Sequence, residues 1–158
     1  MKIREPHRAT RHGSFELRQG ADVVFPLFCP VREGEWLESW NPGVIYSNTG
    51  VAEPECVFTS SDRYGSATWL VSHYDPAARA IHMVKIAPEL TACLLKIGVR
   101  TLSESGSEVS VTYSHTAISP AGKEFVDGFS EAAYSRIMAH WKAALEYFFE
   151  HGSPMPGS

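Results

Sequence analysis

The segment 108–118 carries the pair of side chains best suited to chemistry, a tyrosine and a histidine two residues apart. In a strand, Tyr113 and His115 face the same side of the sheet. The residues that alternate with them are polar and belong on the side that meets water, which turns Tyr113 and His115 inward. An inward phenol and imidazole can orient a ligand carbonyl or serve as acid and base. Alternatively, each makes one hydrogen bond within the core and has no further role.

Two neighbouring segments, 79–86 and 90–102, each contain a lysine that we expect to face solvent, Lys85 and Lys96. Because successive side chains of a strand point to opposite faces, the residues that alternate with each lysine then face the interior. These residues are His82, Val84 and Ile86 in the first segment and Cys93, Leu95 and Ile97 in the second.

The segment 66–74 also alternates, and its composition favours one orientation. The residues that this orientation turns inward are Ala67, Trp69, Val71 and His73. The apolar Leu70 and Tyr74 leave the opposite orientation open. A tryptophan on the inner side of a sheet is either the wall of a cavity or part of a filled core.

Residues 120–150 have the apolar periodicity of a helix, with one broad apolar face. Ser119 is a suitable N-cap, Pro120 suits the first helical position, and Gly152 follows the end. We expect a helix of about 30 residues, long enough to cross a whole sheet. Gly128 marks either a kink that widens the interior or a tolerated glycine.

The strands and the helix face together predict an interior binding site. Ser130 is included because it lies near the apolar stripe, where a polar group needs a partner such as a ligand or a trapped water. The expected lining residues are Trp69, Val71, His73, His82, Val84, Leu95, Ile97, Val111, Tyr113, His115, Phe129, Ser130, Ala133 and Ile137.

Other catalytic and metal-binding patterns are missing from the sequence. Its seven histidines show neither H-x-x-x-H nor H-E-x-x-H spacing, and no cysteine pair accompanies them. The G-x-S-x-G motif of a serine nucleophile and glycine-rich phosphate loops are also absent. We therefore expect no metal and no cofactor.

The order of the elements predicts an α+β domain. A half-buried strand at 8–18 is followed by two short helices within 21–40, which prolines interrupt. Strands separated by short turns fill 44–118, and the short connections favour antiparallel pairing. With the helix at 120–150, the chain forms a sheet of about seven strands with its helices on one side.

Length and composition fit one domain, 1–152, with a flexible tail at 153–158. The chain has 158 residues, 44% of them hydrophobic, and a formal net charge of -4, which argues against a nucleic-acid partner. No segment has the apolar length of a membrane span or the form of a signal peptide. Cys29, Cys56 and Cys93 lie far apart and suit a reducing compartment, so we expect a cytoplasmic protein.

This order of elements resembles the START-like superfamily, also called SRPBCC or helix-grip, and within it a bacterial branch labelled polyketide cyclase/dehydrase-like. Two patches carry the resemblance. The first, FPLFCPVREGEWLESW at 25–40, is similar to the Pro- and Trp-marked small helices of that branch. The second, VTYSHTAIS at 111–119, is similar to its last strand where it enters the long helix. Between the patches the likeness is one of layout, from about residue 8 to residue 150.

The resemblance implies a curved seven-stranded antiparallel sheet wrapped around a long C-terminal helix, with a cavity between them. Members of the superfamily bind lipids, sterols, hormones or polyketides there, and a minority catalyse cyclisation or dehydration. We therefore expect a binding or carrier protein for a small hydrophobic molecule that is lipid-, polyketide- or aromatic-like. A cyclase, aromatase or dehydratase that uses His115 and Tyr113 is one alternative. A protein-interaction module of the chaperone-activator kind, with a filled interior, is another. The sequence does not give the identity of the ligand or the oligomeric state.

Overall fold

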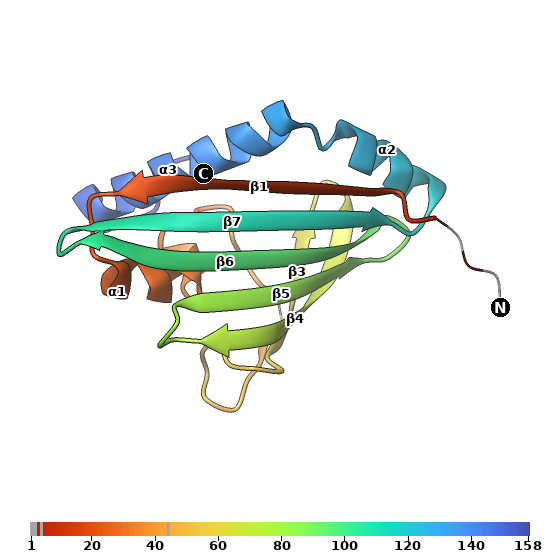
Figure 1. The fold of residues 1–158 in the computed structure, drawn as a ribbon. Coiled ribbons are helices and arrows are strands. Elements are labelled where there is room, and N and C mark those ends of the chain that lie inside the picture. Colours follow the sequence, from red (N-terminus) through yellow and green to blue (C-terminus); the bar gives the residue numbers. More distant parts are fainter. Residues whose placement is uncertain (1–2, 4, 44) are drawn as a thin grey trace.

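One antiparallel sheet of seven strands forms the centre of the molecule, in the order β1-β7-β6-β5-β4-β3-β2. The computed structural model describes residue 3 and residues 5–43 and 45–158. The sheet is strongly curved, and α2 and α3 run along it beside β1 and β7 (Figure 1). The short helices that follow β1 lie at the end of the sheet near the start of β7 (Figure 1).

The bounds of the elements follow the predicted order. The strands are β1 (Arg8–Leu17), β2 (Ile45–Tyr46), β3 (Val57–Asp62), β4 (Gly65–Asp75), β5 (Ala80–Ala87), β6 (Thr91–Ser103) and β7 (Gly106–Ala117). The helices are α1 (Ala21–Val24), the 3-10 helices η1 (Phe25–Phe28) and η2 (Glu33–Glu35), α2 (Pro120–Gly128) and α3 (Glu131–His151). The predicted α+β fold class, with its antiparallel sheet and C-terminal helix, is confirmed.

The side-chain orientation of β4 reverses at a β-bulge between Val71 and His73. Before the bulge, Trp69 and Val71 are buried, as predicted. After it, His73 is exposed, whereas Tyr74 is half-buried and stacks on Phe25 with the ring centroids 5.7 Å apart. The prediction that His73 faces inward is wrong because a bulge adds one residue to a strand and so shifts the alternation of its side chains.

The orientation of β5 is opposite to the predicted one. Ile81 and Met83 are buried, and Lys85 follows them on the same face. The residues that turn outward are His82, Val84 and Ile86. The prediction is wrong because it assumed that a lysine must leave the interior. The Lys85 side chain is only 20% exposed, and the long aliphatic stem of a lysine packs readily against apolar neighbours.

The C-terminal helix is broken into two pieces at Phe129 and Ser130. Phe129 has φ -81° and ψ 61°, which ends α2, and its ring is buried. Ser130 then caps α3, because its side chain accepts a hydrogen bond from the backbone N–H of Ala133 at 3.2 Å. Ser130 is exposed and acts as an N-cap, so its predicted place on the cavity wall is wrong. Gly128, the last residue of α2, marks the position of the break.

Aromatic rings fill the space between the sheet and α3 at the end nearest α1. Trp36 is 0% exposed, and its indole N–H donates to the carbonyl of Leu27 at 2.8 Å. Trp141 of α3 packs against Trp36 and Phe28, with ring centroids 5.7 and 6.0 Å away. We call Phe28, Trp36 and Trp141 the aromatic wedge. It joins the short helices to α3 across the interior.

The residues after α3 pack against the loop that follows η2. Met155 forms a parallel bridge with Leu37. Ser158 is 5% exposed, and its hydroxyl accepts a hydrogen bond from the backbone N–H of Glu38 at 2.8 Å. These contacts differ from the expectation of a free tail at 153–158, since a segment rich in Pro and Gly gives no packing signal of its own. The flexibility of this segment stays a prediction.

A glycine fixes the start of α2 against the connection between β5 and β6. A Cβ atom on Gly122 would lie 1.8 Å from the carbonyl oxygen of Leu90, which is backbone and cannot rotate away. Ser119 adds to the same junction, because its hydroxyl caps the N–H of Gly122 at 2.9 Å and also donates to the carbonyl of Glu89. Only glycine fits this close approach.

We predict that Gly122→Ala destabilises the protein by roughly 2 kcal/mol or more, because α2 has to move away from Leu90. The matched control is Gly128→Ala in the same helix, where an added Cβ has no neighbour within 4 Å. This control should be neutral or stabilising by up to about 1 kcal/mol. Urea denaturation measures both changes, and equal stabilities for the two variants would contradict the close approach.

Candidate functional site

A cavity with two lobes lies between the sheet and the C-terminal helices. The α2 lobe has a volume of about 370 Å³, and the η2 lobe has a volume of about 400 Å³. Asp62, Lys85, Tyr113 and His115 line both lobes, so the two spaces meet at these side chains. Other residues that line the α2 lobe are Tyr64, Ala67, Thr91, Phe125, Phe129, Ala133 and Ile137. Others that line the η2 lobe are Glu33, Leu37, Trp40, Phe58, Trp69, Met83, Leu95 and Trp141.

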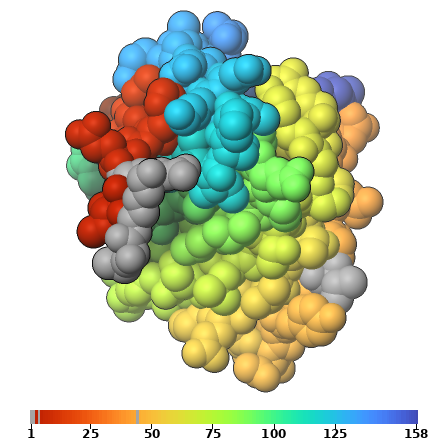
Figure 2. Space-filling model, turned by 90° about the vertical axis from the view of Figure 1, so that its right-hand side faces the viewer, coloured from red at the N-terminus to blue at the C-terminus, as the bar shows by residue number. Residues whose placement is uncertain are grey.

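The turn between β3 and β4 closes one end of the α2 lobe. Figure 2 shows this turn, in yellow, beside α2, in cyan. The ring of Tyr64 meets the ring of Phe125 edge-on, with centroids 5.2 Å apart. Arg63 covers the outer side of the same contact and donates a hydrogen bond to the Tyr64 hydroxyl at 2.8 Å. The closure is therefore an aromatic contact on the surface of the molecule.

Tyr113 and His115 lie together on the inner face of β7, as predicted. Their rings are parallel, with centroids 5.6 Å apart and an angle of 3° between the planes. Phe125 and Phe129 pack edge-on against His115 at 5.0 and 4.7 Å. Burial raises the pKa of the Tyr113 hydroxyl well above its usual value of 10.0. At neutral pH this group is a phenol that can donate a hydrogen bond.

His115 is buried, and its side chain makes one polar contact with the residues that the structure describes. Its Nε2 lies 3.8 Å from the thiol of Cys93, and its Nδ1 is buried without a hydrogen-bond partner among the described residues. Burial, with a smaller contribution from the charge of Lys85, lowers the pKa of His115 to about 4. The imidazole is therefore neutral at pH 7 and is a weak base there.

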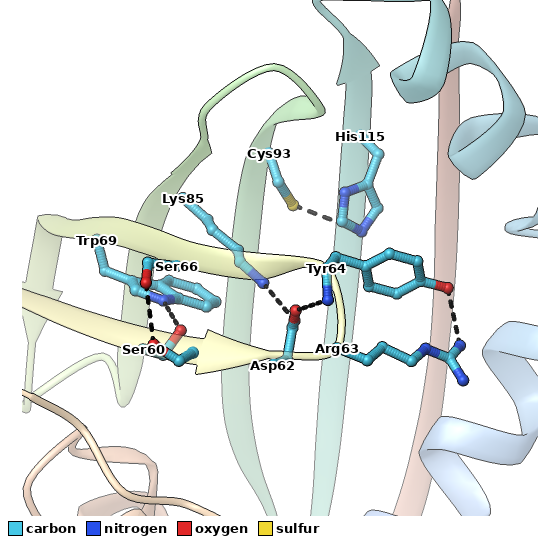
Figure 3. Close-up of polar contacts among 10 residues, drawn as sticks. Ser60, Asp62, Arg63, Tyr64, Ser66, Trp69, Lys85, Cys93 and His115 are labelled. Atoms are coloured by element: carbon cyan, nitrogen blue, oxygen red, sulfur yellow. Dashed lines mark hydrogen bonds and ion pairs between the residues drawn. The ribbon is translucent and has the colours of Figure 1, made fainter.

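Lys85 brings a positive charge into the centre of the cavity (Figure 3). Its Nζ lies 5.2 Å from the centroid of the Trp69 ring and 3.5 Å from a carboxylate oxygen of Asp62. Asp62 ends β3, and its other oxygen accepts the backbone N–H of Tyr64 at 2.7 Å. Trp69 is held in turn by a hydrogen bond from its indole N–H to the Ser60 hydroxyl at 2.8 Å. The ammonium group is thus placed beside an aromatic wall.

Glu33 is a buried carboxyl group on the wall of the η2 lobe. The residue is 5% exposed, and burial raises the pKa of its carboxyl from 4.5 to about 8. It comes from η2, where its carbonyl accepts the backbone N–H groups of Trp36 and Leu37. At neutral pH the side chain is largely protonated and can donate a hydrogen bond into the lobe.

Three solved structures have folds similar to the fold of this chain. Truncated norcoclaurine synthase from Thalictrum flavum has a TM-score of 0.71 and 11% identity, over 96% of this chain and 99% of that one. The complex of that enzyme with dopamine and hydroxybenzaldehyde has a TM-score of 0.67 and 12% identity, over 96% of this chain and 95% of that one. ZhuI aromatase/cyclase from Streptomyces sp. R1128 has a TM-score of 0.67 and 12% identity, over 94% of this chain and 100% of that one.

The chain has the START-like helix-grip fold. Identities this low support the fold alone, and the predicted helix-grip fold is confirmed. No protein-family model and no curated protein matches the chain by sequence. The side chains in the cavity therefore have to be interpreted from their own geometry.

Half of the predicted lining residues lie on the wall of this helix-grip cavity. They are Trp69, Leu95, Tyr113, His115, Phe129, Ala133 and Ile137. Val71, Ile97 and Val111 face inward, but they belong to the packed core and line neither lobe. His73, His82, Val84 and Ser130 lie outside the cavity for the reasons given above. Whether the wall residues contact a ligand stays a prediction.

The sequence did not point to the charged residues of the cavity. Lys85 was assigned to solvent, although the buried Ile81 and Met83 share its parity. Asp62 sits in a turn, where aspartate is ordinary. Glu33 lies in a charged run whose inward side only the structure reveals. The alternation in β5 was the one signal that could have placed Lys85 correctly.

Among the residues that the structure describes, no three His, Cys, Asp or Glu side chains are grouped so that they could hold a metal ion. Within the same residues, no helix is both long and apolar enough to cross a membrane.

We predict that Glu33→Gln stabilises the protein at high pH and has little effect at low pH. The folded state keeps the Glu33 proton up to a pKa of about 8, whereas the unfolded carboxyl loses it near 4.5. Glu33 therefore has no effect on the stability of the wild-type protein below pH 4.5. It lowers this stability progressively as the pH rises to 8, and the stability stays lowered above that value. The gain from Glu33→Gln should be on the order of 3 kcal/mol at pH 8 and near zero at pH 4.

The matched control is Glu35→Gln, two residues along the same 3-10 helix. Glu35 pairs with Arg32 at 2.8 Å, and this hydrogen bond lowers the pKa of the Glu35 carboxyl. Glu35→Gln removes this ion pair and should destabilise the protein by about 0–1 kcal/mol at neutral pH. The difference from wild type should disappear as the pH falls below 4.5. Urea titrations at pH 4, 6 and 8 compare the two variants. A gain for Glu33→Gln that is equal at all three values would show that folding does not raise the pKa of Glu33.

Proposed function

We propose that this protein binds a small hydrophobic, ring-containing molecule in the cavity between the sheet and the C-terminal helices. The aromatic wall of the η2 lobe carries this proposal. Phe58 and Trp69 stack in parallel with centroids 5.6 Å apart, and Trp40 meets both edge-on at 5.9 and 6.3 Å. Trp141 adds a further ring from α3. Flat walls of this kind favour a flat ligand, and each lobe has the volume of a small-molecule site.

The similar structures point in the same direction. Norcoclaurine synthase is described in complex with dopamine and hydroxybenzaldehyde, and ZhuI is an aromatase/cyclase. Dopamine and hydroxybenzaldehyde are small ring compounds. A lipid- or polyketide-like ligand remains within the proposal where it presents a ring or a flat conjugated segment to the η2 lobe. A cytoplasmic location, which suits the three free cysteines, is part of the same proposal.

Binding without acid–base catalysis by Tyr113 and His115 is the form of the function that we favour. His115, with a pKa of about 4, is a weak proton acceptor at pH 7, and Tyr113, with its raised pKa, holds its proton. Both remain suited to hydrogen bonding with a ligand. The alternative of a protein-interaction module required a filled interior, and the two lobes count against it.

We predict that the purified protein binds methyl 2-naphthoate, a neutral two-ring probe, saturably and with one molecule per chain. Isothermal titration calorimetry measures this binding. The variant Met83→Trp places a bulkier side chain into the η2 lobe from β5 and should weaken binding roughly tenfold or more, because it fills the space that the ring needs.

The control is Val84→Trp, the next residue of β5, which lies on the outer face and should leave binding unchanged. Thermal melts of both variants establish that they are folded. Mass spectrometry of an organic extract from the denatured protein should also detect a ring compound retained during purification. Failure of the probe to bind, or equal affinities in the two tryptophan variants, would remove the η2 lobe as the binding site.

A further inference from the structure

Lys85 is an unusual group to find at the centre of an apolar binding cavity. Among the described lining residues, the other cation is Arg63, which lies on the exposed turn and hydrogen-bonds to Tyr64. Lys85 instead comes from the inner face of β5, two residues beyond the buried Met83. Its position at the junction of the two lobes means that any ligand occupying both of them passes its amine.

The ammonium group has more hydrogen-bonding capacity than its described neighbours use. An ammonium has three N–H donors. Asp62 supplies the one acceptor contact, at 3.5 Å, which is at the long limit of a hydrogen bond. The Trp69 ring faces the same amine at 5.2 Å and offers attraction without an acceptor atom. A ligand with an acceptor can therefore complete the hydrogen bonding of Lys85.

Beyond its pair with Asp62, the charge of Lys85 meets mainly neutral polar groups in the inner part of the cavity. Tyr113 and His115 are neutral at pH 7, and the pKa of Glu33, at about 8, keeps most of its carboxyl protonated. Asp62, which pairs with Lys85 at 3.5 Å, has a side chain that is 48% exposed, so water screens its charge. Glu124 of α2 also lines the α2 lobe, and it is exposed as well. An anionic group in the inner part of the cavity would thus meet one cation, Lys85, and the hydrogen-bond donors of Tyr113 and Glu33.

We propose that Lys85 makes the cavity selective for an anionic ligand, such as an aromatic carboxylate, whose negative group binds the Lys85 ammonium while its ring lies in the η2 lobe. This inference rests on the proposed function, because it assigns the charge of the ligand that the aromatic wall holds. Charge-assisted hydrogen bonds in a partly desolvated site are strong and directional. The same ammonium would repel a cationic ligand.

The test compares 2-naphthoate with its uncharged methyl ester by calorimetry at pH 7. The two probes share a ring system and differ in charge. Wild-type protein should bind the carboxylate roughly tenfold or more tightly than the ester. Lys85→Met, which keeps the length of the side chain and removes the charge, should abolish this preference, so that the carboxylate and the ester bind the variant with similar affinities. Lys85→Arg should preserve the preference.

Two further variants make the test independent of any single substitution. Asp62→Asn removes the competing carboxylate, so it should tighten binding of 2-naphthoate and raise the ratio of its affinity to that of the ester several-fold. Lys96→Met, which removes an exposed lysine of β6, is the matched control and should leave both affinities unchanged. Thermal melts show whether each variant is folded.

The outcomes separate this inference from the function on which it rests. If the ester binds wild-type protein as tightly as the carboxylate, or if Lys85→Met keeps the preference, the role of Lys85 is overturned and the binding function stands. A weaker affinity of Asp62→Asn for 2-naphthoate would also overturn it. If neither probe binds, the proposed function fails, and the inference fails with it.

Discussion

The aromatic wedge sets the distance between the sheet and α3, and the rest of the interior depends on that distance. Phe28 and Trp36 enter from the short helices, and Trp141 meets them from α3. Near the start of α3, the Tyr134 hydroxyl donates to the carbonyl of Val111 in β7 at 2.7 Å and ties the helix to the sheet. Rings of this size cannot be compressed, because protein interiors are already close-packed. The helix is therefore held away from the strands beyond the wedge, and the two lobes occupy the remaining space.

A polar junction divides this hollow interior. Tyr113 and His115 at the junction, and Glu33 in the η2 lobe, are predominantly uncharged at neutral pH because burial shifts each pKa toward the neutral form. The partly covered Lys85 pairs with Asp62 and lies beside the ring of Trp69. The interior thus combines flat apolar walls with hydrogen-bond donors at its middle. Such a surface recognises a ligand by the place of one polar group on an otherwise apolar body.

Much of the fold could be predicted from the sequence, because the signals that define it are local and repeated. Period-two alternation located β1, β6 and β7 with their correct faces, and short turns required antiparallel pairing. The same alternation placed Tyr113 and His115 on the inner face of the sheet. These positions depend only on neighbours within a single strand.

The features that escaped prediction depend on partners that are distant in sequence. The bulge at His73 follows from the pairing of β4 with β5, and no residue type announces it. The inward Lys85 depends on the ring of Trp69, which adjoins it from β4. Ser130 ends one helix and begins another because its hydroxyl caps α3, whereas the apolar stripe runs through both helices without interruption. Glu33 is buried on the wall of the η2 lobe, which it shares with Trp40 and with Trp141, a residue more than 100 positions away.

The division of the C-terminal helix has a consequence for how this scaffold can diversify. The wedge reaches α3 through Trp141, whereas Phe125 and Phe129, which wall the α2 lobe, belong to the preceding segment that Gly122 fixes in place. Substitutions in that short segment can reshape one chamber without disturbing the rings that hold the domain together. Ligand preference can thus drift during evolution through the side chains of this segment, as long as Gly122 keeps its close approach to Leu90.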